Sequence, residues 1–300
     1  MKKKCIFGVL ICAIAAVLLA GCVDRDRNEL GTPSTSPISY GDAKRVAASD
    51  LQKYVNRLIS LDHIYQNHKV KFQSSYTDEK SGAGFLQIRR IGDHSKPYSE
   101  EEKDALRQSI YEAIGAKFPL AIEAYTIGKQ PMATGRITAI DETGRLLIVS
   151  SDKYLDQEKK MLDAAWYGMA DDGIILYEGK LLALTDIKIG STVKAWSEGL
   201  MLTSYPEQTT GLKLEITALD DGTGDARGVV TALTKTGEGV NIQRTIEIDE
   251  VKYDLSSNAQ VWLNGEKKAI ADIKTGDHVK IWFSGLTGLP MSVTQVVVER

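Results

Sequence analysis

Cysteine and histidine are scarce in this 300-residue chain, and their placement excludes several kinds of site. Two of the three cysteines, Cys5 and Cys12, lie in an apolar N-terminal run, so Cys22 is the only one beyond that run. A single cysteine cannot form an intrachain disulfide or a cysteine-based zinc site. His63 and His68 are five residues apart, which does not stack them on one helical face. We therefore expect no metal site and no cofactor.

Motifs that carry chemistry are also missing. The chain has no Gly-x-Ser-x-Gly elbow, no phosphate-binding loop and no dinucleotide fingerprint. Its formal net charge of −3 does not attract polyanions, which argues against a nucleic-acid partner. We expect no catalytic residues and favour a protein that is not an enzyme. The alternative is an envelope enzyme whose site lies in a cleft between domains.

The N-terminus has the order of an export signal. Three lysines precede an apolar run at residues 5–20, which is shorter than the roughly 20 residues of a membrane-spanning helix. The run ends in Leu19-Ala20-Gly21-Cys22, which resembles the bacterial lipoprotein signal. The resemblance implies removal of residues 1–21 and acylation of Cys22. The lipid would then anchor the chain to the outer face of the cell membrane.

The segment after the signal divides into a tether and a first domain. Residues 22–40 are polar and rich in Ser, Thr and Pro, which is typical of a flexible tether. Residues 41–130 have the order helix, strand, strand, helix, strand, and the second helix begins with a capping-box pattern at Ser99 and Glu102. We expect an α+β domain in which helices cover a small antiparallel sheet.

The remainder of the chain is an internal repeat. Residues 184–199 and 270–285 are identical at eight of sixteen aligned positions, and both copies are rich in short strand patterns and Gly turns. The predicted units span residues 133–219 and 226–300. Small closed barrels are the expected fold of each, because closure removes exposed strand edges. We favour an OB-like barrel, with an SH3-like barrel as the alternative.

The repeated stretch also predicts a backbone conformation. Gly190 and Gly276 each follow an Asp-Ile-Lys-x sequence and precede a strand. We expect both glycines to turn the chain with a positive φ, which residues with a Cβ rarely adopt. Trp196 and Trp282 then occupy equivalent positions, and alternation along the strand favours a structural rim position over a ligand-stacking face.

Both repeats resemble a YobA-like domain found in lipoproteins of Gram-positive, Bacillus-like bacteria. The resemblance rests on residues 165–167, 186–190, 193–196 and 204–208 in the first repeat, and the second repeat departs from the pattern. It covers residues 133–300 and implies a fold and an extracytoplasmic address, but no activity.

Three aromatic residues are the best candidates for ligand contact: Trp166, Tyr167 and Tyr205. The second repeat lacks Trp166 and Tyr205, so they are not required by the repeated fold itself. The acidic residues 171–172 and 220–225 are interpreted as turn and linker positions. We therefore expect a lipid-anchored binding or spacing module whose partners are the bilayer and an envelope protein or glycan. A sporulation or envelope-assembly component is a further alternative.

Overall fold

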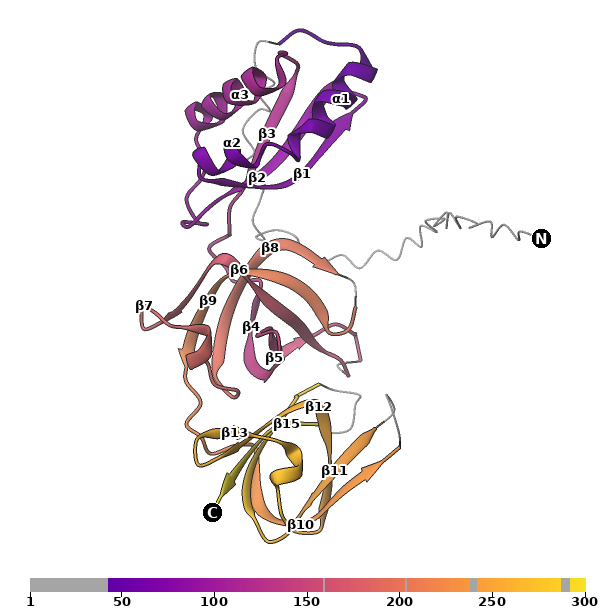
Figure 1. Ribbon diagram of the computed structural model, residues 1–300, viewed down its shortest axis with the longest axis vertical. Coiled ribbons are helices and arrows are strands. Elements are labelled where there is room, and N and C mark those ends of the chain that lie inside the picture. Colours follow the sequence, from indigo (N-terminus) through magenta and orange to yellow (C-terminus); the bar gives the residue numbers. More distant parts are fainter. Residues whose placement is uncertain (1–42, 159, 203, 238–241, 287–291) are drawn as a thin grey trace, which may run out of the picture.

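The computed structural model describes residues 43–300 except residues 159, 203, 238–241 and 287–291. Three units follow one another along the long axis of the molecule, and each contains one sheet (Figure 1). The signal segment, Cys22 and the proposed tether lie outside the described residues.

The first unit places three helices over one face of a three-stranded sheet. Helix α1 buries Leu51, Val55 and Leu58, which recur at three- and four-residue steps and face the sheet. Helix α3 begins with the predicted capping box, in which Ser99 and Glu102 bond each other's backbone N–H groups. The elements are α1 (Ala48–Leu58), α2 (Asp62–Asn67), β1 (Val70–Asp78), β2 (Ala83–Arg90), α3 (Glu100–Ile114) and β3 (Leu120–Tyr125).

The sheet of the first unit is mixed, so the expectation of an antiparallel sheet is wrong. Strands β1 and β2 form an antiparallel hairpin, but β3 runs parallel to β2. Helix α3 connects β2 to β3 and returns the chain to the same end of the sheet, which makes the pairing parallel. Local apolar patterns locate the strands but do not specify their relative direction.

The second and third units are built on the same plan. Their sheets have the orders β5-β4-β8-β9-β6-β7 and β11-β10-β14-β15-β12-β13, with additional pairings β5–β6 and β11–β12. The second contains β4 (Ala133–Ile140), β5 (Leu146–Tyr154), β6 (Leu162–Tyr177), β7 (Lys180–Leu181), β8 (Thr192–Leu202) and β9 (Glu207–Ala218). The third contains β10 (Ala226–Thr236), β11 (Gln243–Ile248), β12 (Val251–Leu263), β13 (Glu266–Lys268), β14 (His278–Phe283) and β15 (Ser292–Glu299).

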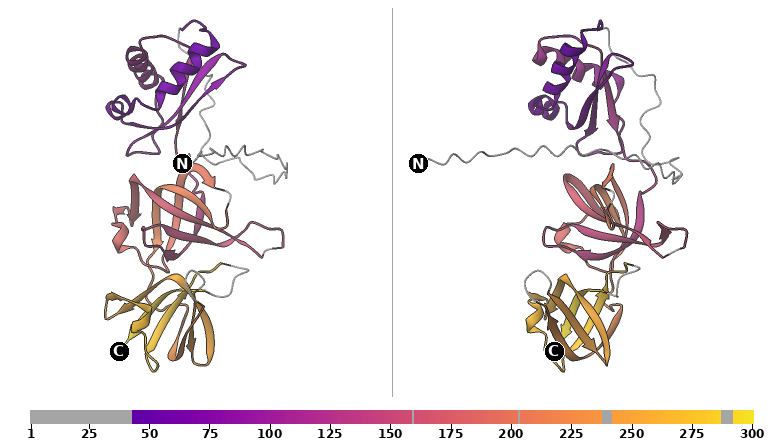
Figure 2. Two further views of the ribbon diagram at one scale, coloured as in Figure 1. Left: turned by 45° about the vertical axis from the view of Figure 1, so that its right-hand side comes forward. Right: turned by 90° about the vertical axis from the view of Figure 1, so that its right-hand side faces the viewer.

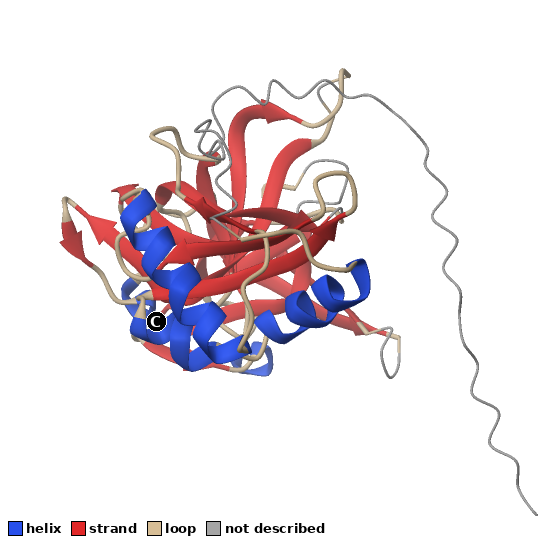
Figure 3. Cartoon of the chain, turned by 90° about the horizontal axis from the view of Figure 1, so that it is seen from above, coloured by secondary structure: helices blue, strands red, loops and turns tan. Residues whose placement is uncertain are grey.

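The predicted fold class, an α+β domain followed by two small OB-like or SH3-like barrels, is wrong. The chain is mostly β, with 51% strand and 16% helix, and its three sheets stack in a solenoid-like manner. Figure 2 shows the three units one after another with the helices confined to one end, and Figure 3 shows the helices and strands from above. Parallel pairs such as β6–β9 and β12–β15 join strands that are distant in sequence. Strand patterns do not reveal such pairings, and they decide the architecture.

The repeated stretch forms the same turn in both larger units. Short 3₁₀ turns, η1 (Leu184–Asp186) and η3 (Ile270–Asp272), precede Gly190 and Gly276. These glycines have φ values of 104° and 89°, which confirms the predicted positive φ. The backbone N–H of Gly190 donates to Ile137 at 2.7 Å, and that of Gly276 donates to Val230 at 2.8 Å. Each turn therefore fastens the chain to the first strand of its own unit.

One predicted strand is in fact a hairpin. The pattern over residues 245–255 predicts a continuous strand, but β11 ends at Ile248 and β12 begins at Val251. Asp249 and Glu250 form the turn between them, with φ values of 46° and 69°. Two consecutive positive φ values fit a tight hairpin turn, which Gly or Asn commonly marks. Asp249 is followed here by Glu250, so the sequence lacks the Asn-Gly or Asp-Gly pair that marks such a turn.

Candidate functional site

The junction between the first and second units is held by a buried arginine. Arg89 lies at the end of β2, and its side chain is 1% exposed. It donates to both carboxylate oxygens of Asp172 at 2.6 and 2.8 Å and, through Nε, to Glu198 at 2.7 Å. Asp172 lies in β6 and Glu198 lies in β8, so one guanidinium joins two strands of the second unit to the first. Two-pronged pairs of this kind fix orientation as well as distance.

The carboxylate of Asp172 is strongly held in its charged form. Burial alone would raise the pKa of Asp172, but the hydrogen bonds and positive charge of Arg89 outweigh it and lower this pKa to about 2. Residues 171–173 are interpreted from the sequence as a turn, but the structure places them inside β6, at a shift in its pairing with β9. That interpretation is therefore wrong. The irregularity lies where β6 faces the first unit.

His94 completes the junction beside this ion pair. Its side chain is 1% exposed, and its two ring nitrogens lie 3.2 Å from the backbone oxygen of Arg90 and 3.0 Å from that of Asp172. Neither nitrogen is directed at Ser95, whose hydroxyl instead donates to Asp93 at 2.7 Å. The consecutive Asp-His-Ser sequence therefore does not form a nucleophile–base relay.

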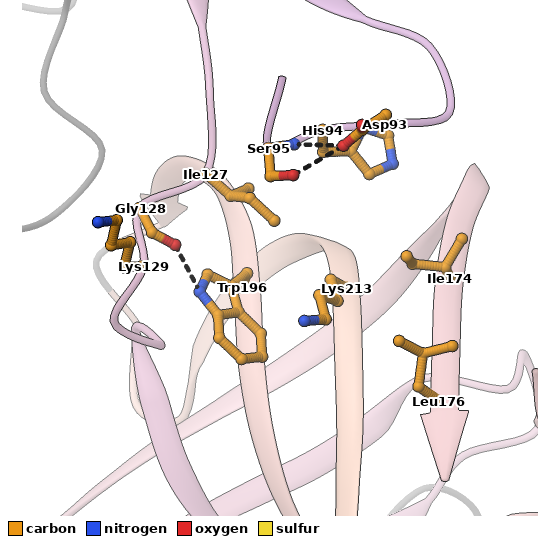
Figure 4. Close-up of a pocket in the computed structure, with 10 residues that line it drawn as sticks. All are labelled: Asp93, His94, Ser95, Ile127, Gly128, Lys129, Ile174, Leu176, Trp196 and Lys213. Atoms are coloured by element: carbon orange, nitrogen blue, oxygen red, sulfur yellow. Dashed lines mark hydrogen bonds between the residues drawn. The ribbon is translucent and has the colours of Figure 1, made fainter. Parts of the chain in front are cut away.

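A pocket of about 260 Å³ opens at the same junction (Figure 4). Trp196 forms part of its wall, and the indole N–H donates to the backbone oxygen of Gly128 at 2.9 Å. The ammonium of Lys213 lies 4.5 Å from the centre of the Trp196 ring. Trp196 is only 6% exposed, so it fastens the segment that enters the second unit rather than presenting an open stacking face.

Trp282 has the equivalent task at the second junction. It is 2% exposed, and its indole N–H lies 3.3 Å from Oδ1 of Asp220 in the linker between the second and third units. Thr294 donates to the backbone oxygen of Thr138, and Gln260 donates to Ile140 at 3.0 Å. The tryptophan at the equivalent position of each repeat therefore holds the segment that leads into the sheet of that repeat.

The structure separates the three aromatic residues predicted to contact a ligand. Trp166 and Tyr167 are neighbours in β6, so their side chains point to opposite faces of the sheet. Tyr167 lies fully buried in the core of the second unit, and burial raises the pKa of its hydroxyl. Trp166 and Tyr205 pack instead in a cluster that includes Leu286 of the third unit. They do not form one exposed patch with Tyr167.

The junction residues could not be identified as a group from the sequence. Arg89 and Glu198 are 109 positions apart, and no motif links them. One available signal is the charged Arg89 at the end of an apolar strand, where burial requires a charged partner. Among the described residues, no group of His, Cys, Asp and Glu is placed to hold a metal ion.

Comparisons with protein-family models, with curated proteins and with solved structures found no match to this chain. Within the part of the chain that the structure describes, no helix has both the length and the apolar character needed to cross a membrane.

Proposed function

We propose that this protein is an extracytoplasmic lipoprotein, anchored through acylated Cys22, that serves as a spacing module at the cell envelope. The observation that carries the spacing role is the fixed attachment of consecutive units. Arg89 joins the first unit to the second through two carboxylates, and Trp196 and Trp282 fasten the two connecting segments. Units attached in this way transmit a defined length, whereas units on free linkers do not.

The anchor supports the same proposal from the sequence. The order of lysines, apolar run and Leu-Ala-Gly-Cys resembles a lipidation signal, and it lies directly before residues 23–40. A lipid at Cys22 would hold the chain at the bilayer, and the three units would extend from it. Mass spectrometry of protein from its native host should find an acylated N-terminal Cys22. An unmodified Met1 would reject the anchor but would leave the spacing role open.

Distances between units test the spacing role directly. Spin labels at Lys117→Cys and Lys180→Cys report on the first junction, and labels at Lys180→Cys and Lys267→Cys report on the second; all three positions are exposed. Pulsed electron resonance should give one narrow distance distribution for each pair. Arg89→Ala should broaden the first distribution and leave the second unchanged. Broad distributions for both pairs in the parent protein would refute a spacing role.

The rival proposal is an envelope enzyme with a site in the cleft between units. The pocket at the first junction is lined by residues of two units, as such a site would be. Its histidine, His94, directs both ring nitrogens at backbone oxygens, which leaves neither of them for a substrate. This observation favours the spacing role over the enzyme.

A further inference from the structure

The pocket at the first junction has two chemically different sides. Ile127, Ile174 and Leu176 form an apolar wall, and these side chains are half-buried (Figure 4). The ammonium of Lys213 supplies positive charge on another part of the lining, whereas that of Lys129 points outward, away from Trp196 and Lys213 (Figure 4). Such a combination of apolar surface and a few polar groups is typical of sites for small molecules.

The ammonium of Lys213 is held in place before any ligand arrives. It lies 4.5 Å from the centre of the Trp196 ring and 3.3 Å from a carboxylate oxygen of Glu215. The Lys213 side chain is 24% exposed, so its charge is partly withdrawn from water. An ammonium has three N–H donors, and Glu215 accepts from one of them. The others are available to an anionic group.

The rim carries one negative charge as well. Asp93 accepts hydrogen bonds from the backbone N–H of Ser95 at 3.2 Å and from its hydroxyl at 2.7 Å. These bonds keep the Asp93 side chain in one orientation, at the edge of the pocket in Figure 4. A ligand with several negative charges would be repelled by Asp93 and by Glu215, whereas a single carboxylate can accept from the N–H donors of Lys213 that Glu215 does not use.

We propose that this pocket binds a small monocarboxylate with an apolar body. The carboxylate would pair with Lys213, and the body would lie against Ile174 and Leu176. The volume of about 260 Å³ is below the usual range for drug-sized ligands, which sets the size of the occupant. In the third unit the strand partner of Trp282 is Gln295, whereas that of Trp196 is Lys213.

Because Gln295 replaces the lysine in the third unit, we expect the site only at the first junction. The proposed binding does not depend on the spacing role. An α-amino acid carries an ammonium next to its carboxylate, whereas a simple fatty acid carries none. L-leucine and 4-methylpentanoate therefore separate the two sources of such a carboxylate. The uncharged 4-methylpentanamide has the same body without the charge.

The experiment follows the indole N–H signals of the full chain, labelled with ¹⁵N at tryptophan and kept in a non-ionic detergent. Trp196→Phe and Trp282→Phe assign two of the four signals. Titration with 4-methylpentanoate or L-leucine should shift the Trp196 signal with saturation and leave the Trp282 signal unchanged. The amide should bind about tenfold more weakly or worse, because it lacks the charge-assisted bond.

Variants identify the groups responsible. Lys213→Met should weaken binding about tenfold, whereas Lys129→Gln, whose ammonium points outward, should change it little. Lys180→Gln removes an exposed lysine of the same unit that does not line the pocket, and it should have no effect. Equal shifts with the amide and the carboxylates, or unchanged binding in Lys213→Met, would overturn the proposal. So would the absence of a saturable Trp196 shift with both carboxylates.

Discussion

Replacing the two equivalent turn glycines by alanine separates backbone strain from steric contact. Gly276 has a φ of 89° and no atom within 4 Å of an added Cβ, so Gly276→Ala introduces strain alone. That strain costs about 1–2 kcal/mol. Gly190 has a φ of 104°, and an added Cβ would lie 2.1 Å from Oδ1 of Asp220. Gly190→Ala therefore introduces strain and a clash.

The clash has a calculable consequence. The Cβ of Asp220 is itself 2.9 Å from the added atom, so the whole side chain must move. In the parent protein this carboxylate accepts hydrogen bonds from the indole N–H of Trp282 at 3.3 Å and from the backbone N–H of Gly222 at 3.0 Å. Movement of the Asp220 side chain breaks both bonds. Each lost bond costs about 0.5–1.5 kcal/mol. The combined cost of Gly190→Ala is about 2–5 kcal/mol.

Hydrogen exchange measured by mass spectrometry reports on each unit separately, which a single melting curve of a chain of several units does not. Gly276→Ala should accelerate exchange in β10 and β14 about 5- to 30-fold. Gly190→Ala should accelerate exchange in β4 and β8 by more than about 30-fold. Lys188→Ala and Lys274→Ala, at exposed positions in the same turns, should leave exchange nearly unchanged. Equal effects of the two glycine variants would refute the clash, and unchanged exchange in Gly276→Ala would refute the strain.

Three further predictions concern the junctions and the anchor. Arg89→Ala leaves Asp172 and Glu198 without their buried cation and should destabilise the first junction by about 3–5 kcal/mol, seen as faster proteolysis of residues 126–132. Because the folded pKa of Asp172 is about 2 and its ordinary value is 3.8, its stabilisation is present above about pH 4 and should be lost as the pH falls towards 2; Asp172→Asn should abolish that part of the acid dependence. Cys22→Ser should prevent acylation and release the protein from membranes, measured by fractionation; retention of the variant at the membrane would contradict a lipid anchor.

Local chemistry made several features readable from the sequence. The capping box of α3 depends on two residues three positions apart, and both side chains bond the backbone of their own turn. The positive φ of Gly190 and Gly276 was predictable because a repeated Gly before a strand indicates a turn that other residues adopt at a cost. The signal that ends at Cys22 is likewise a contiguous pattern, and it stays a prediction.

Tertiary structure decided what contiguous patterns do not contain. The sheet class depends on parallel pairs such as β6–β9, whose partners are brought together by the whole path of the chain. Alternation in β6 separates Trp166 from Tyr167, but only the packing of the units determined that Trp166 would lie beside Leu286. Arg89 meets Asp172 and Glu198 across a junction between two units. Such contacts form only when the units pack together, because residues far apart in sequence come within bonding distance only in the folded chain.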